Sequence, residues 1–194
     1  MSDPVAVILA AGRAERMGRP KQLLPYRDTT VLGAVVEAAG AAGFSRPVVV
    51  LGAYADEVRR VVDLAGCEVV VNPDPDRGNL SSLRVAAAIT ADAPVLLLMG
   101  DMPGIEPTVL AAHVEAHRRE ARWLRTTDYE DGIGHPFLLS AELMASLDDL
   151  GGSKPLWALT ADERATSLEV AGPMPVDVDT PEDYEEALGR HVSE

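Results

Sequence analysis

The sequence is poor in several features, and each scarcity excludes a class of protein. A single cysteine, Cys67, in 194 residues excludes an intramolecular disulfide and a cysteine-based zinc cluster. Aromatic residues make up only 4% of the chain, which favours helices packed on a parallel sheet over an aromatic-rich β-sandwich. No apolar run approaches transmembrane length, and no basic segment followed by an apolar one stands at the N-terminus. We therefore expect a cytoplasmic protein without a membrane partner.

Positive charge is also scarce, with 17 Lys and Arg against 31 Asp and Glu and a formal net charge of −14. A negative overall field repels phosphate backbones, so we expect no nucleic-acid partner. The same field makes a local group of cations informative, and Arg16, Arg19 and Lys21 lie close together in the chain. A hydrophobic content of 47% in a chain of this length predicts a single domain over residues 1–194.

Strand and helix patterns alternate along the first hundred residues. The apolar runs predict strands over 5–10, 47–51, 68–71 and 94–99. Helical patterns lie between them over 31–42, 55–64 and 80–90. This alternation predicts an α/β fold with a doubly wound, mostly parallel sheet that binds ligands at the carboxyl ends of its strands. Two further strands, over 121–127 and 131–139, predict a small antiparallel addition in the C-terminal third.

The loop after the first strand has the composition of a phosphate site. Leu9 is followed by the small residues Ala10, Ala11 and Gly12, against which a ligand can approach the main chain, and the cations follow. Backbone N–H groups in such a turn form an anion-binding concavity, and guanidinium and ammonium groups add charge. The loop lacks G-x-G-x-x-G and G-x-x-x-x-G-K-[ST], which argues against a dinucleotide-binding dehydrogenase and a P-loop NTPase.

The pattern L-A-A-G-x-x-x-R-M-G-x-P-K-x-L-L over residues 9–24 resembles the signature loop of the MobA-like nucleotidyltransferases, most closely the molybdenum-cofactor cytidylyltransferase branch. The resemblance implies a Rossmann-like nucleotidyltransferase fold. It also implies that the loop wraps the triphosphate of a nucleotide, with Arg16 and Lys21 holding the phosphates. Leu9, Ala10, Ala11 and Gly12 would then belong to the nucleotide site.

Two carboxylates are candidate ligands for the Mg²⁺ that accompanies a nucleoside triphosphate. Asp101 directly follows the fourth strand, where helix capping explains it poorly, and Mg²⁺ prefers one or two carboxylates. The segment Gly100-Asp101-Met102-Pro103 also resembles the family's G-D-x-P motif, whose Asp binds the metal. Asp179 matches the first Asp of the family's D-T-P-E-D element and is the expected partner ligand, ahead of Asp177. Thr180 is expected to begin the last helix.

Residues for the base and for the acceptor are predicted at two other places. Asn79, Ser81 and Ser82 stand at a helix start, where they can cap the helix or read the polar edge of a base. In the resembling family this region contacts the base, and the second Ala of L-A-A-G favours cytosine. His135, within Gly134-His135-Pro136, resembles a G-H-P motif that contacts the acceptor, although a lone His can also be structural.

The resemblance implies a Mg²⁺-dependent transfer of CMP from CTP to a phosphorylated acceptor, such as a molybdopterin-type cofactor, with release of pyrophosphate. An ionised phosphate needs no general base, and the sequence has no evident Ser-His-Asp or Cys-His constellation. Residues 151–157 lack the Asp and Arg of the G-D-x-G-A-R element found in cofactor-specific relatives. The alternatives are therefore a guanylyltransferase, a sugar-1-phosphate or cobinamide-type nucleotidyltransferase, and a non-catalytic nucleotide- or cofactor-binding module.

Overall fold

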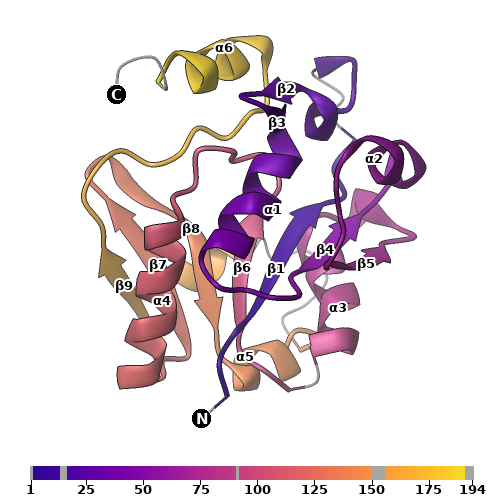
Figure 1. The fold of residues 1–194 in the computed structure, drawn as a ribbon. Coiled ribbons are helices and arrows are strands. Elements are labelled where there is room, and N and C mark those ends of the chain that lie inside the picture. The colour runs from indigo at the N-terminus through magenta and orange to yellow at the C-terminus, as the bar shows by residue number, and fades with distance from the viewer. Residues whose placement is uncertain (1, 14–16, 91, 150–155, 191–194) are drawn as a thin grey trace.

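A seven-stranded sheet with strand order β5-β4-β1-β6-β8-β7-β9 forms the centre of the fold (Figure 1). The fold comes from a computed structural model, which describes residues 2–13, 17–90, 92–149 and 156–190. The strands are β1 (Val5–Ala10), β4 (Val48–Leu51), β5 (Glu68–Val71), β6 (Val95–Met99), β7 (Leu124–Tyr129), β8 (Gly132–Leu139) and β9 (Ala165–Glu169).

The sheet is mostly parallel, and its antiparallel part lies in the C-terminal third of the chain. Strands β5, β4, β1 and β6 are parallel neighbours, whereas β8 runs antiparallel to both β6 and β7. The expected doubly wound fold is confirmed. The chain moves outward from β1 through β4 to β5 and then returns to β6 on the other side of β1. The crevice between the carboxyl ends of β1 and β6 is therefore the switch point at which such sheets bind ligands.

Helices cover both faces of the sheet. One face carries α1 (Val31–Ala41), α2 (Ala55–Val61) and α4 (Pro107–Arg119), and the other carries α3 (Asn79–Thr90) and α5 (Ala141–Ala145). In β1, Ala6 and Ile8 pack toward α1, and Val7 and Leu9 pack toward α3. Because both faces of β1 are buried, the strand is an unbroken apolar run rather than an alternating one.

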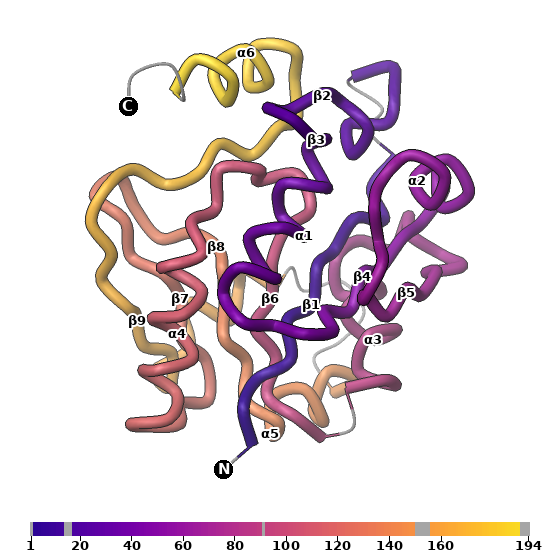
Figure 2. The backbone as a smooth tube through the Cα atoms, viewed as in Figure 1, coloured from indigo at the N-terminus to yellow at the C-terminus, as the bar shows by residue number. Residues whose placement is uncertain are grey.

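A smaller layer lies across the carboxyl end of β1, at the top of Figure 1. It consists of α6 (Pro181–Gly189) and the antiparallel pair β2 (Pro25–Tyr26) and β3 (Thr29–Thr30). An apolar cluster of Leu24, Tyr26, Val31, Val178 and Ala187 joins them. The chain between β9 and α6, residues 170–179, runs from the β9 edge of the sheet across its top (Figure 2), and we call it the strap.

Helix α6 begins at Thr180, as expected, through a complete capping box. The Thr180 side chain accepts a hydrogen bond from the backbone N–H of Asp183, and the Asp183 carboxylate accepts one from the backbone N–H of Thr180. The short Asp side chain thus serves where Glu or Gln is the usual choice. Among the described residues, none of the helices is long and apolar enough to cross a membrane.

Candidate functional site

A cavity of about 410 Å³ lies at the switch point between β1 and β6. Its walls come from the loop after β1, the end of β6, the start of α3 and the strap. Leu9, Ala10, Ala11 and Gly12, all predicted to bind a nucleotide, line it. Arg16, the predicted phosphate ligand of the same loop, lies outside the described residues.

The loop after β1 is held by a side chain that the sequence analysis missed. The side-chain amide of Gln22 donates to the carbonyl oxygens of Ala10 (3.1 Å) and Gly12 (3.2 Å). On the other side, a Cβ atom at Gly52 would lie 2.2 Å from the carbonyl oxygen of Ala11, so only glycine permits this close approach. The loop is therefore fixed from two sides, which orders its backbone before any ligand binds.

Lys21, Asp101 and Asp179 meet in this cavity although they come from three distant parts of the chain. The Lys21 ammonium lies 2.6 Å from Asp101 Oδ2 and 2.7 Å from Asp179 Oδ1, and Lys21 is buried. Burial is the largest influence on the pKa of Lys21 and lowers it, but the two carboxylates together outweigh burial and raise the pKa. Lys21 is therefore positively charged across the physiological pH range.

Asp177 is a third carboxylate of the same site, which the sequence analysis ranked behind Asp179. Oxygen atoms of Asp101, Asp177 and Asp179 all lie within 4.8 Å of one another. Loss of solvent around the Asp177 carboxyl group, followed by repulsion from Asp101, raises its pKa to about 7, although the residue as a whole is exposed. The D-x-D spacing could have revealed it, because alternate residues of an extended segment point to the same side.

The donor set of this cluster fits a hard divalent cation. Carboxylate oxygens are the ligands that Mg²⁺ and Mn²⁺ prefer. Within the described ranges, Asp101 Oδ1 is buried and has no hydrogen-bond partner, so one lone-pair-bearing atom is left for a ligand. The backbone N–H of Val178 donates to the carbonyl oxygen of Asp101 (2.9 Å), which attaches the strap to the end of β6.

The predicted base contacts are placed unequally. Asn79 lines the cavity. Ser81 and Ser82 instead accept hydrogen bonds from the side-chain amide of Asn72, at 2.8 and 3.0 Å, and Ser82 is buried. The two hydroxyl groups thus hold the loop before α3 in this structure. Their contact with a base stays a prediction, and Asn79 is the polar side chain of this helix start that lines the cavity.

A bidentate ion pair that the sequence analysis missed joins two loops beside the cavity. Arg13 Nε lies 2.5 Å from Asp76 Oδ1, and an Arg13 terminal nitrogen lies 2.8 Å from Asp76 Oδ2. Both residues line the cavity and are largely exposed. No local pattern could have predicted the pair, because its members belong to loops that only the fold brings together.

A second cavity of about 690 Å³ adjoins the first and shares Asn79, Met99 and Asp177 with it. His135, the predicted acceptor contact, lines this second cavity together with Trp157. The cavity that has Leu9, Ala10, Ala11, Gly12, Lys21 and Asn79 thus adjoins the one that has His135, with Asp177 at their boundary.

His135 is a half-buried, neutral residue at the wall of this cavity. Its ring stacks on Phe137 with centroids 4.1 Å apart. Burial lowers the pKa of His135 to about 4, against a smaller opposing effect of the Leu97 backbone. Its Nδ1 atom is buried and has no hydrogen-bond partner among the described residues. A neutral imidazole can position a substrate by a hydrogen bond but adds no charge.

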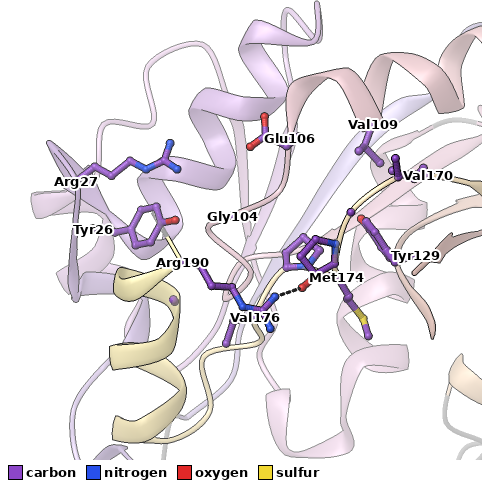
Figure 3. A pocket seen from close by; sticks show the side chains of 15 residues that line it. Tyr26, Arg27, Gly104, Glu106, Val109, Tyr129, Val170, Met174, Val176 and Arg190 are labelled. Carbon is purple, nitrogen blue, oxygen red and sulfur yellow. Dashed lines mark hydrogen bonds between the residues drawn. The ribbon is translucent and has the colours of Figure 1, made fainter. Parts of the chain in front are cut away.

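A third cavity, of about 510 Å³, lies on the other side of the strap, between α6, the β2–β3 pair and the start of α4 (Figure 3). Arg190 crosses toward the strap and donates to the carbonyl oxygen of Met174 at 2.8 Å (Figure 3). Met174 also lines the second cavity, the one that has His135, so the strap separates two spaces.

The fold is that of an α/β protein with a mostly parallel sheet. The switch point of this sheet has a small-residue loop, a buried lysine and three carboxylates, which suit phosphates and a divalent cation. Residues 6–168 match the family described as MobA-like NTP transferase domain, and the chain belongs to that family. The enzyme class is accordingly that of a nucleotidyltransferase.

Relatives of known name differ in how much of the chain they cover. The molybdenum cofactor cytidylyltransferase of Escherichia coli K12 is 29% identical over 197 residues, 99% of each chain. The nicotine blue oxidoreductase of Paenarthrobacter nicotinovorans is 38% identical over 114 residues, 58% of this chain and 56% of that protein. This chain thus spans little more than half of the second relative.

A solved structure resembles the whole fold. The crystal structure of Rv0371c from Mycobacterium tuberculosis H37Rv has a TM-score of 0.89 at 41% identity, covering 97% of this chain and 99% of that one. A complex of Rv0371c with manganese has a TM-score of 0.85 at 39% identity over the same shares.

Proposed function

We propose that this nucleotidyltransferase transfers CMP from CTP to a phosphorylated acceptor, such as a molybdopterin-type cofactor, and releases pyrophosphate. The observation that carries the proposal is the adjoining pair of cavities with Asp177 at their boundary. One cavity has Lys21 and the carboxylates of a phosphate and cation site, and the other has His135. The name of the full-length relative from Escherichia coli supports cytidylyl transfer.

The nucleotide would occupy the cavity at the switch point. Backbone N–H groups of the loop from Leu9 to Gly12, with Lys21 and Arg16, would hold its phosphates. Asp101 and Asp179, joined by Asp177, would hold Mg²⁺. A divalent cation there supplies charge neutralisation for the triphosphate and for the departing pyrophosphate.

The acceptor would lie in the adjoining cavity, with its phosphate directed at the boundary. An oxygen of that phosphate forms the new bond to the α-phosphorus, and the bond from the α-phosphorus to the bridging oxygen of pyrophosphate breaks. An ionised phosphate is already a nucleophile, so the side chains have only to align the two substrates. Lys21 offsets the negative charge that develops on pyrophosphate, and neutral His135 positions the acceptor.

The proposal favours cytosine over a purine as the base. The methyl groups of Ala10 and Ala11 occupy space that glycine would leave for a larger ring, and the amide of Asn79 can both donate and accept hydrogen bonds. A base that leaves one buried polar group unpaired loses about 1–3 kcal/mol. We therefore expect CTP to exceed GTP and ATP by at least about tenfold in kcat/KM.

The test is pyrophosphate release from each nucleotide with Mg²⁺ and a panel of acceptors. We expect Asp101→Asn to abolish turnover while leaving the fold intact, whereas Asp56→Asn, at an exposed position on α2, should leave turnover unchanged. Comparable turnover of GTP would favour a guanylyltransferase, and turnover only with sugar 1-phosphates would favour that branch. CTP binding without pyrophosphate release with any acceptor would favour a non-catalytic binding module.

A further inference from the structure

Lys21 stands where a cation bound to the carboxylate cluster would stand. Its ammonium group contacts Asp101 Oδ2 and Asp179 Oδ1, the residues to which the proposed function assigns the metal. We propose that Lys21 occupies the cation position in the free protein, and that a nucleoside triphosphate draws Lys21 onto its phosphates and thereby opens the cluster to the divalent cation. This inference rests on the proposed function of the same site.

The contacts of Lys21 are those of an ion that competes with a metal. At 2.6 and 2.7 Å, both are short, charge-assisted hydrogen bonds to ionised oxygens. A magnesium ion binds carboxylate oxygens at about 2.0–2.1 Å, so an ion that uses Asp101 Oδ2 and Asp179 Oδ1 would take the lone pairs that Lys21 now holds. A divalent cation and the ammonium group on the same oxygens would also repel each other at a few ångströms. The ammonium group and the divalent cation therefore compete for the cluster.

The loop toward which Lys21 would turn lies beside it. Lys21 lines the same cavity as the loop from Leu9 to Gly12, which would receive the phosphates. Its neighbour Gln22 is bonded to the carbonyl oxygens of that loop, so the Lys21 backbone is fixed beside the phosphate site. Lysine carries a point charge on a flexible four-carbon stem. Only the end of the side chain has to turn from the carboxylates to the phosphates.

The consequence is a coupling between two binding events. In the free protein, Lys21 forms ion pairs with Asp101 and Asp179, which lowers the affinity of the cluster for a cation. When the triphosphate holds Lys21, all three carboxylates face the cation without that competitor. By thermodynamic reciprocity, the cation must then raise nucleotide affinity by the same factor.

The experiment measures Mn²⁺ binding to the full chain without nucleotide, from the electron paramagnetic resonance signal of free Mn²⁺. We expect Lys21→Met, which keeps the length of the side chain but removes its charge, to bind Mn²⁺ at least about tenfold more tightly than the wild type. Lys21→Gln should show the same gain and serves as the second neutral variant should Lys21→Met not fold. Lys21→Arg, which keeps a cation, should retain weak binding.

Two controls locate the effect. Arg59→Met removes one positive charge from an exposed position of α2 and should leave Mn²⁺ affinity unchanged. Adding Asp101→Asn to Lys21→Met should abolish the gain. Equal Mn²⁺ affinity in the wild type and both neutral variants, lost on Asp101→Asn, would overturn the competition and leave the metal site of the proposed function intact. Absence of any Asp101-dependent Mn²⁺ binding would overturn both.

Discussion

Asp183 fixes the end of the strap, and its replacement by alanine has a calculable cost. Its Oδ2 atom accepts hydrogen bonds from the backbone N–H groups of Asp179 (3.1 Å) and Thr180 (2.7 Å). Hydrogen bonds to a charged group contribute about 1.5–3 kcal/mol, but both donors are partly exposed and can be rehydrated, so about 1 kcal/mol each is the better value. Loss of a negative charge at the N-terminus of α6 adds about 0.5 kcal/mol.

The expected loss in the free energy of unfolding is thus about 2.5 kcal/mol, which lowers Tm by about 5–10 °C in a chain of this size. Glu182→Ala is the matched control, because Glu182 lies in the same first turn but is exposed. It should cost only the charge term, a Tm change of about 1–2 °C. Thermal and urea unfolding followed by circular dichroism measure both variants. Equal losses would refute the assignment of the two hydrogen bonds.

Two further predictions concern pH. The pKa of Asp177, raised to about 7 from an ordinary 3.8, means that folding disfavours its ionised form, so stability falls as pH rises from about 4 to 7. Allowing for screening at this exposed residue, the free energy of unfolding of Asp177→Asn should exceed that of the wild type by about 1 kcal/mol at pH 8 and match it near pH 3 in urea unfolding. A difference that does not change with pH would contradict the raised pKa of Asp177. Burial, followed by the charge of Arg125, lowers the pKa of His113 to about 3 in the folded chain. Below pH 6.5 the unfolded chain binds a proton at His113 and the folded chain does not, so the free energy of unfolding is highest above pH 6.5 and falls as pH drops toward 3. The His113 ring should show no NMR titration above pH 4, and a midpoint near 6.5 would contradict its burial.

The parallel half of the sheet could be predicted because each of its inner strands is buried on both faces. The unbroken apolar run of β1 and the similar run of β6 follow from that burial. Strand β9 escaped prediction because it is an edge strand of mixed polarity, Ala-Thr-Ser-Leu-Glu, without a fully buried residue. Its pairing with β7 is determined by the sheet beside it and not by its own sequence.

In the candidate site, too, single residues could be predicted from the sequence but the contacts between them could not. Asp101 could be predicted because it directly follows a strand end, and Lys21 because it stands in a motif that resembles the signature loop of a known family. Their contact could not be predicted, because it joins residues 80 positions apart that only the fold brings together. Gln22 was missed for a similar reason: its function is to hold carbonyl oxygens that precede it, and a single Gln carries no such signal.

The two halves of the site rest on different parts of the fold. The loop after β1 continues a strand buried at the centre of the sheet, whereas Asp177 and Asp179 belong to the strap, which has a cavity on either side. Polar contacts anchor the strap near its middle: Asp131 accepts from the Met174 N–H at 2.8 Å, and Arg190 donates to the Met174 carbonyl. Because Met174 also lines the second cavity, a ligand in that cavity that moved the strap would move two of the three carboxylates. Ala10 and Ala11, which are buried at the end of β1, would stay in place.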